Sequence, residues 1–197
     1  MANLGRVRLS GVACAFGGAL WVVALLAGVF AHDAIYGDAA SYRAWEGLLI
    51  VTQALLLVGV LGLAGSGAAG DGWLGRLGLG IAILGRVAFV IGECRSLIQG
   101  RDDEVFVPLG ALLTGLGMLL AGIGIVRVRR WGGWHRAIPL LTGVYPFVAM
   151  FPFFVLTDTP PAAAIALWGP LWLALGLALR DEASGRELAG SGAALAA

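Results

Sequence analysis

Lysine is absent from this chain of 197 residues, and histidine and cysteine occur only twice each. Without lysine, the chain can form no Schiff base to retinal or pyridoxal phosphate and has no P-loop lysine. His32 and His135 fall near opposite ends of their apolar stretches, which argues against a haem held by two histidines. Cys14 and Cys94 differ in depth by about 20 Å at the rise of an α-helix, too far for a disulfide. We therefore expect neither a cofactor nor a metal.

Charge is also scarce. Only 13% of the residues are charged, against about 25% in a soluble domain, while 59% are hydrophobic and the mean hydropathy is +0.90. The net charge of +1 gives no electrostatic reason to expect a nucleic-acid partner. The composition predicts an integral membrane protein in contact with membrane lipids.

Six apolar segments satisfy the requirement of about twenty residues per membrane-spanning helix. They are Leu9–Ala31, Glu46–Ala64, Leu77–Ile98, Val105–Val128, Ala137–Leu156 and Ala162–Leu179. We predict an all-α, polytopic fold with one six-helix transmembrane domain over residues 1–180. The small, polar stretch over residues 181–197 predicts a disordered cytoplasmic tail.

The distribution of arginine orients the predicted bundle in a cell membrane. One side holds nine arginines: Arg6, Arg8, Arg76, Arg127, Arg129, Arg130, Arg136, Arg180 and Arg186. The links on the other side hold only Arg43 and Arg101, together with several carboxylates. Because cytoplasmic loops carry the excess of Lys and Arg, we expect both termini in the cytoplasm.

The third apolar segment contains three ionisable residues, Arg86, Glu93 and Arg95. A charge at the centre of a membrane helix costs about 2.5–3.5 kcal/mol on insertion scales, so such residues normally face a bundle interior or a wet cavity. Arg86 and Glu93 are seven residues apart and share a helix face, as do Glu46 and Gln53 on the second segment. If these faces meet, they predict a pocket that opens toward the outer leaflet. Arg95, near the end of its helix, is expected to extend toward the interface.

Two interpretations of this cluster remain open. Arg86 and Glu93 could form an ion pair that only fixes helix packing. Alternatively, a desolvated carboxyl group retains a proton and donates it in catalysis, while Arg86 acts as its electrostatic partner. On the second interpretation, Glu93 is the proton donor and Glu46 a second carboxylate.

The fifth segment is interrupted by Pro139, Pro146 and Pro152, and irregular backbone at membrane depth survives only inside protein or beside a cavity. Aromatic residues of the last two segments could line such a cavity or face lipid. With Gln53, the predicted substrate-binding set is Tyr145, Phe147, Phe151, Trp168 and Trp172. Ring faces attract positive charge, which suits a reaction that passes through cationic character.

The chain resembles a broad group of small six-helix actinobacterial membrane proteins, mostly of unassigned function. The resemblance rests on RVRRWGGWHRAIPLLTGVYPF (Arg127–Phe147) and on LWGPLWLALGLALR (Leu167–Arg180). A weaker resemblance is to small integral-membrane terpene cyclases of fungal meroterpenoid and actinobacterial indole-terpenoid pathways. Trp45-Glu46 is similar to a Trp-Glu pair on a membrane helix of the fungal enzymes, which have seven helices. That resemblance implies a compact helical bundle whose buried carboxylates protonate an alkene or epoxide.

We therefore expect an acid–base enzyme of the cyclase or isomerase type that acts on a lipophilic small molecule. The alternative is a carrier of a small solute or ion, or a non-catalytic accessory subunit. The sequence predicts neither the substrate nor the oligomeric state.

Overall fold

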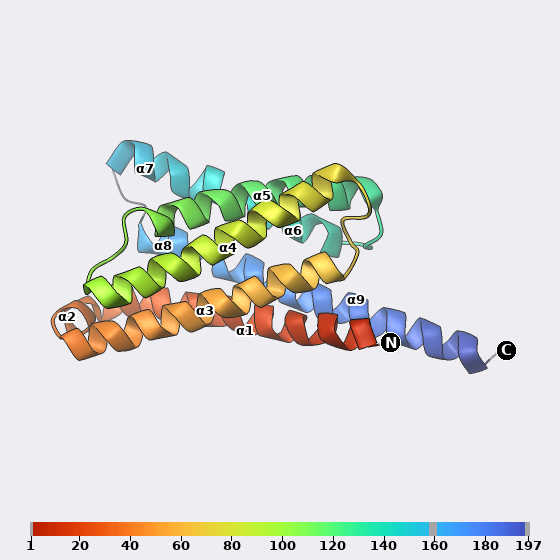
Figure 1. Cartoon of the computed structure of the whole chain (residues 1–197), viewed down its shortest axis with the longest axis horizontal. Coiled ribbons are helices and arrows are strands. Elements are labelled where there is room, and N and C mark those ends of the chain that lie inside the picture. Colours follow the sequence, from red (N-terminus) through yellow and green to blue (C-terminus); the bar gives the residue numbers. More distant parts are fainter. Residues whose placement is uncertain (1, 158–160, 196–197) are drawn as a thin grey trace.

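Over the residues that it describes, 2–157 and 161–195, the computed structural model of the chain is entirely helical (Figure 1). The elements are α1 (Ala2–Phe30), α2 (His32–Tyr36), α3 (Ala39–Gly65), α4 (Trp73–Gln99), α5 (Phe106–Val128), η1 (His135–Ala137), α6 (Ile138–Tyr145), η2 (Pro146–Met150), α7 (Phe151–Thr157), α8 (Ala162–Ala166) and α9 (Gly169–Leu195). In the described residues, six helical stretches are long and apolar enough to cross a membrane. They are Leu4–Phe30, Ala39–Gly65, Trp73–Gln99, Phe106–Val128, His135–Phe153 and Ala162–Gly185. The prediction of an all-α chain with six potential spans is confirmed.

The second span begins earlier than its apolar stretch. α3 starts at Ala39 rather than at Glu46, because Asp38 caps the helix. Its carboxylate accepts hydrogen bonds from the backbone N–H of Ser41 at 2.8 Å and from the Ser41 hydroxyl at 3.0 Å. The same hydrogen bonds hold the pKa of Asp38 below its usual value. The cap adds two turns of helix and so makes Tyr42 and Trp45 helical residues.

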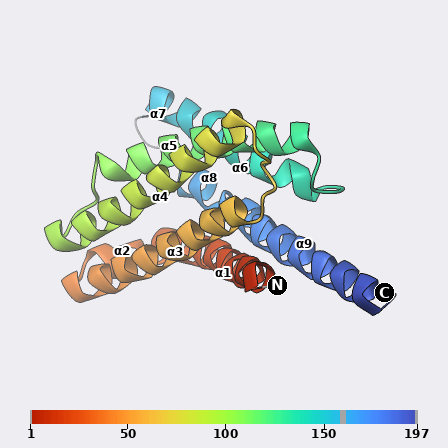
Figure 2. The same cartoon turned by 45° about the vertical axis from the view of Figure 1, so that its right-hand side comes forward.

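The C-terminal region differs from the prediction. Where a disordered tail was expected over residues 181–197, α9 continues as far as Leu195, and residues 196–197 lie outside the described part. Figure 2 shows this part of α9 extending past the N-terminus. Alanine, leucine, glutamate and arginine all favour helix. The first turn beyond the predicted segment Ala162–Leu179 is also anchored, because a Glu182 carboxylate oxygen lies 2.9 Å from Nδ1 of His135.

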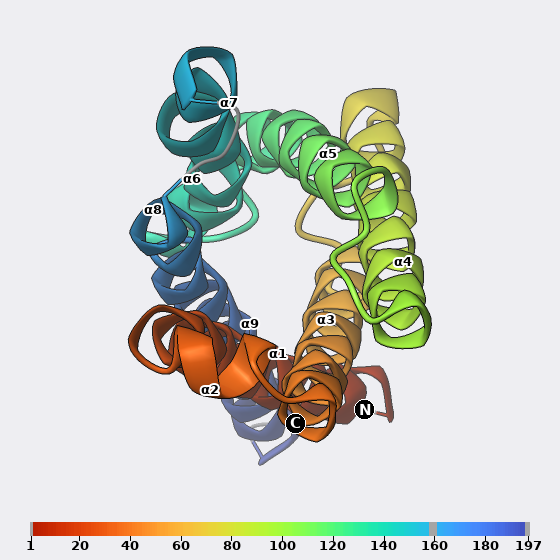
Figure 3. The ribbon, with the colours of Figure 1, turned by 90° about the vertical axis from the view of Figure 1, so that its left-hand side faces the viewer.

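The spanning helices form a closed ring. Contacts follow the cyclic order α3, α4, α5, α6, α9, α1 and back to α3, which can be followed end-on in Figure 3. α2, α8 and the α4–α5 connection lie at one end, called here the α2 end (Figure 1). The N-terminus and the α3–α4 and α5–α6 connections lie at the other, called here the terminal end.

Glycine permits close contact along the seam between α4 and α5. A Cβ atom on Gly78 would lie 2.3 Å from the backbone nitrogen of Ala121, and one on Gly85 would lie 2.4 Å from that of Thr114. Both distances are shorter than real Cβ contacts, so these positions exclude larger residues. Helix association in membranes depends on such small residues, because lipid supplies no hydrophobic drive between helices.

The fifth span is broken as its prolines predicted. Pro139 lies in the first turn of α6, Pro146 begins the π-helical turn η2, and Pro152 lies in the first turn of α7. Proline lacks the N–H that would bond the carbonyl four residues earlier, which explains the departure from α-helix at Pro146.

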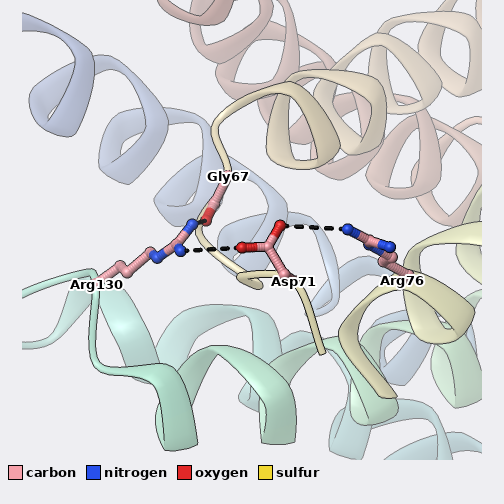
Figure 4. Close-up of polar contacts among 4 residues, drawn as sticks. All are labelled: Gly67, Asp71, Arg76 and Arg130. Atoms are coloured by element: carbon pink, nitrogen blue, oxygen red, sulfur yellow. Dashed lines mark hydrogen bonds and ion pairs between the residues drawn. The ribbon is translucent and has the colours of Figure 1, made fainter. Parts of the chain in front are cut away.

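The terminal end of the ring is held by ion pairs and filled by a tryptophan. Asp71 of the α3–α4 connection lies 3.2 Å from an Arg76 nitrogen and 3.4 Å from an Arg130 nitrogen (Figure 4). Arg130 also donates to the carbonyl oxygen of Gly67 at 3.0 Å. Next to it, Trp131 is only 1% exposed and borders a small cavity of about 70 Å³ among α1, α3 and α9.

Candidate functional site

A pocket of about 330 Å³ lies inside the ring at the α2 end. Residues of α1, α2, α3, α4, α5, η2 and α8 contribute to its wall, together with Trp168 between α8 and α9. Most of them are apolar or aromatic. Its carboxyl groups belong to Glu46, Glu93 and Asp102. An apolar hollow with a few convergent polar groups is the usual form of a small-molecule site.

The helix faces that carry Glu46 and Glu93 meet at this pocket. Glu46 projects from α3 and Glu93 from α4, and both line the pocket while being only 1% and 5% exposed. One carboxyl oxygen of Glu46, Oε2, makes no hydrogen bond with any described residue. A pocket-lining residue therefore has a buried carboxyl oxygen without a hydrogen-bond partner in the described part of the chain.

Behind the pocket, Gln53 joins Glu93 to Arg86. An Arg86 Nη1–H donates to Oε1 of Gln53 at 2.6 Å, and Nε2 of Gln53 donates to Oε1 of Glu93 at 3.3 Å. Because a guanidinium can only donate, it fixes the orientation of the amide and turns the amide N–H₂ toward Glu93. In place of the direct ion pair that one of the two interpretations required, Arg86 and Glu93 are bridged by Gln53.

Arg86 is fully buried, and three aromatic rings surround it. Its Cζ atom lies 4.0 Å from the ring centre of Trp172, 5.0 Å from that of Trp168 and 5.2 Å from that of Phe89. These cation–π contacts compensate part of the lost hydration. Its Nε and Nη2 groups make no hydrogen bond with described residues. Gln53, Arg86 and Trp172 lie outside the pocket wall and support it from behind.

The mouth of the pocket lies among α2, the start of α3 and the α4–α5 connection. The Tyr42 hydroxyl donates to Oδ1 of Asp102 at 3.2 Å, and Tyr36 packs its ring 5.7 Å from that of Trp45. Burial, with Asp102 nearby, raises the pKa of Tyr36 to about 12, so this phenol keeps its proton. His32 lies at the mouth as well, 3.5 Å from the exposed Asp33.

The α4–α5 connection is fixed by Asp103. Nε of Arg95 donates to Oδ2 of Asp103 at 2.7 Å, and the backbone N–H of Phe106 donates to Oδ1 at 2.5 Å. These hydrogen bonds, that from Arg95 foremost, hold the pKa of Asp103 below its usual value. Arg95, expected to extend toward the interface, is instead paired within the protein.

The aromatic residues predicted to line the cavity separate into two groups. Trp168 lines the pocket, whereas Tyr145, Phe147 and Phe151 do not. The Tyr145 hydroxyl donates to the carbonyl oxygen of Ala164 at 2.8 Å, and the rings of Phe147 and Phe151 stack with centres 5.4 Å apart. These three hold α6, η2 and α7 in place.

Most of the aromatic wall comes from residues that were not predicted from the sequence. Trp21 of α1, Trp45 of α3 and Phe89 of α4 line the pocket, with Tyr36 at its mouth. Two signals were present. Trp21 lies in the middle of its span, whereas membrane tryptophans concentrate at the interfaces. Phe89 lies three residues after Arg86 and four before Glu93, and therefore on the same helix face.

Neither a metal site nor a disulfide occurs in the described part of the chain. No group of three or more histidine, cysteine, aspartate or glutamate side chains is placed to hold a metal there. Both cysteines are free, and the buried Cys14 Sγ lies 3.3 Å from the carbonyl oxygen of Trp172.

No protein-family model, no curated protein and no solved structure matches this chain. The resemblances to six-helix actinobacterial membrane proteins and to membrane terpene cyclases therefore stay predictions.

Proposed function

We propose that the protein is a membrane enzyme that isomerises or cyclises a lipophilic small molecule by acid–base catalysis. The observation that carries this proposal is the pair of buried carboxyl groups, Glu46 and Glu93, inside an otherwise apolar pocket with aromatic walls. Proton transfer to a carbon–carbon double bond requires an acid held away from bulk water, and both carboxyl groups are buried.

In the proposed reaction, Glu93 gives its proton to one carbon of a carbon–carbon double bond. The π electrons form the new C–H bond, the double bond is lost, and a carbocation develops on the neighbouring carbon. The rings of Trp21, Phe89 and Trp168 lie around that charge and stabilise it. An adjacent carbon then loses a proton to Glu46, directly or after a carbon–carbon bond closes a ring, and a new double bond forms. No electrons are gained or lost, and the two neighbouring glutamates can exchange the proton before the next turnover.

Arg86 and Gln53 have a supporting part in this scheme. Arg86 holds the Gln53 amide so that its N–H contacts Oε1 of Glu93. With Oε1 accepting that hydrogen bond, the other oxygen of Glu93 is the one that carries the transferable proton.

We further propose that the ring spans a cell membrane with both termini in the cytoplasm. Nine of the thirteen arginines fall on the terminal side in sequence, and the positive-inside rule places that side in the cytoplasm. The pocket then opens at the outer leaflet, where a lipophilic substrate dissolved in the bilayer can reach it.

A carrier of a small solute or ion is the alternative, as is an accessory subunit. A carrier needs access from both membrane faces. Three features favour the enzyme instead. Arg86 and Trp172 are fully buried on the side of the pocket that faces the terminal end. Buried residues such as Leu56 and Met118 fill the centre of the ring, and Trp131 fills the terminal end.

The test measures deuterium incorporation into lipophilic metabolites, so the substrate need not be known in advance. Membranes from a deletion strain that expresses the protein are incubated in D₂O with a lipid extract of the same strain. We expect a lipophilic metabolite to gain deuterium with the intact protein and with Glu104→Gln, and to gain none with Glu93→Gln. Glu104 is the matched control, since it lies at the same end and pairs with Arg101 outside the pocket. Identical labelling in all three samples would refute the proposal.

A further inference from the structure

The polar groups that line the pocket are unbalanced in charge. Three of them are carboxyl groups, from Glu46, Glu93 and Asp102, and His32 lies at the mouth. No arginine of the described chain lines the pocket. A phosphate, diphosphate or carboxylate would therefore meet acceptors of its own sign. The lining excludes an anionic head on the ligand and favours a positive one.

The tryptophans that line the pocket have no free hydrogen-bond donor. Nε1 of Trp21 donates to the carbonyl of Ile165 at 2.8 Å, that of Trp45 to the carbonyl of Ala24 at 3.0 Å, and that of Trp168 to the carbonyl of Thr142 at 2.9 Å. All three indole N–H groups are thus engaged by backbone carbonyl oxygens. A ligand therefore meets these residues as aromatic rings without a free donor, and ring faces attract cations.

Three of these rings form a compact group. The ring centres of Trp21 and Phe89 are 6.1 Å apart, those of Trp21 and Trp168 are 6.2 Å apart, and those of Phe89 and Trp168 are 6.5 Å apart. Arg86 lies over the Phe89 and Trp168 rings, so two of the three already contact a cation, and aromatic rings are the known means by which proteins hold quaternary ammonium groups.

The buried charges also leave room for one more cation. Glu46 and Glu93 can together carry two negative charges, and Arg86 supplies one positive charge to this cluster through Gln53. Buried charges are normally paired. A ligand with a single positive charge makes the set neutral with both carboxyl groups ionised.

Size sets a further limit. A cavity of about 330 Å³ is at the small end of the range of about 300–1,000 Å³ for small-molecule pockets, so it suits a compact head. A longer chain attached to such a head would have to project through the mouth.

We propose that the ligand of this pocket has a compact apolar head of that size and bears one positive charge, permanently as an ammonium group or transiently as a carbocation. This inference rests on the proposed function, because an ammonium ion then mimics the charged intermediate and binds more tightly than the neutral substrate.

Three ligands of the same size test the charge preference: benzyltrimethylammonium, the neutral neopentylbenzene and the anionic phenylmethanesulfonate. Binding is measured by calorimetry to the full chain in phosphatidylcholine nanodiscs, with protein-free nanodiscs subtracted. We expect the cation to bind at least about tenfold more tightly than the neutral compound, and the anion not to bind. Glu93→Gln and Phe89→Leu should each weaken cation binding, whereas Glu104→Gln should leave it unchanged.

Equal affinity for the cation and its neutral counterpart, or tighter binding of the anion, would overturn the inference. The ligand series on the unaltered protein gives this answer even if a variant does not fold. Cation binding without deuterium incorporation that depends on Glu93 would support the inference and refute the proposed catalysis. Deuterium incorporation that depends on Glu93, without a preference for the cation, would support the proposed catalysis and refute the inference.

Discussion

Replacing Gln53 by leucine should destabilise the protein strongly, because it removes the hydrogen-bond acceptor of a fully buried guanidinium. Arg86 donates to Gln53 Oε1 at 2.6 Å, a short distance typical of a charge-assisted bond. Its Nε and Nη2 groups have no other hydrogen-bond partner in the described chain. Leucine is close to glutamine in size, so the change creates little cavity and mainly leaves a buried charge without a polar partner.

The magnitude follows from comparing two kinds of hydrogen bond. Neutral side-chain pairs between membrane helices contribute about 0.6 kcal/mol on average and about 1.7 kcal/mol at most. Hydrogen bonds to charged groups contribute about 1.5–3 kcal/mol, and breaking a buried ionic contact costs about 3–5 kcal/mol. Because Arg86 is charged and entirely enclosed, we expect Gln53→Leu to lower the free energy of unfolding by about 3 kcal/mol or more.

A double-mutant cycle with Arg86→Met isolates the contact. The double variant replaces both partners by apolar groups of similar shape, which is often neutral for stability, although it also loses the cation–π contacts, worth about 0.5–2 kcal/mol. We expect a coupling energy of about 2–3 kcal/mol from unfolding in mixed detergent micelles, followed by circular dichroism. A coupling energy near zero, with the two single effects simply adding, would refute the reasoning and show that Arg86 does not depend on Gln53.

Three further predictions concern packing, pH and orientation. Gly78→Ala should destabilise the chain by about 1–3 kcal/mol in the same unfolding assay, because its Cβ atom would collide with α5. Gly80→Ala, two residues along α4 and with open space around it, should instead stabilise it by about 0.5–1 kcal/mol. The pKa of Asp103 is lowered in the folded protein, so its stabilising effect is present above its unfolded pKa of about 3.9 and is lost as the pH falls further. The midpoint difference between the unaltered chain and Asp103→Asn should therefore shrink below about pH 4, and a constant difference would contradict this. In intact cells, a membrane-impermeant maleimide should label Glu104→Cys and not Asp71→Cys, with the unsubstituted chain as control; the opposite pattern would reverse the proposed orientation.

The spans could be predicted from the sequence because the bilayer imposes their length and polarity. Hydropathy alone located all six. Their ends were less predictable, since they depend on polar contacts that hydropathy does not register. Asp38 moves the start of α3 into a polar stretch by capping it, and the Glu182–His135 contact anchors α9 at the start of the expected tail.

The composition of the pocket wall required tertiary information. Hydropathy indicates how deep a residue lies in the membrane, but it does not indicate which helices pack against each other. The ring closes through contacts of α1 with α3 and α9, so Trp21, from the first span, meets Phe89 of α4 and Trp168 near α9. The aromatic residues of the fifth span were equally plausible candidates in sequence. Of the irregular segment η2 it is Met150 that lines the pocket, whereas Phe147 stacks with Phe151 outside the pocket wall.

The bridging role of Gln53, by contrast, can be predicted from the spacing of residues in the sequence. Residues seven apart on a helix share a face, but their Cα atoms are separated by about 10.5 Å along the axis. Arg86 and Glu93 can both turn inward at that separation, and a direct bond between them would require both side chains to extend along their own helix. A bridging group from the adjacent antiparallel helix meets the geometry more easily. Gln53 lies on the same face of α3 as Glu46 and two turns deeper, level with the gap between Arg86 and Glu93. An amide suits this position because one end accepts from the guanidinium while the other donates to the carboxyl group. A matched pair of seven-residue spacings on neighbouring antiparallel spans therefore predicts a crossed polar cluster rather than two separate ion pairs.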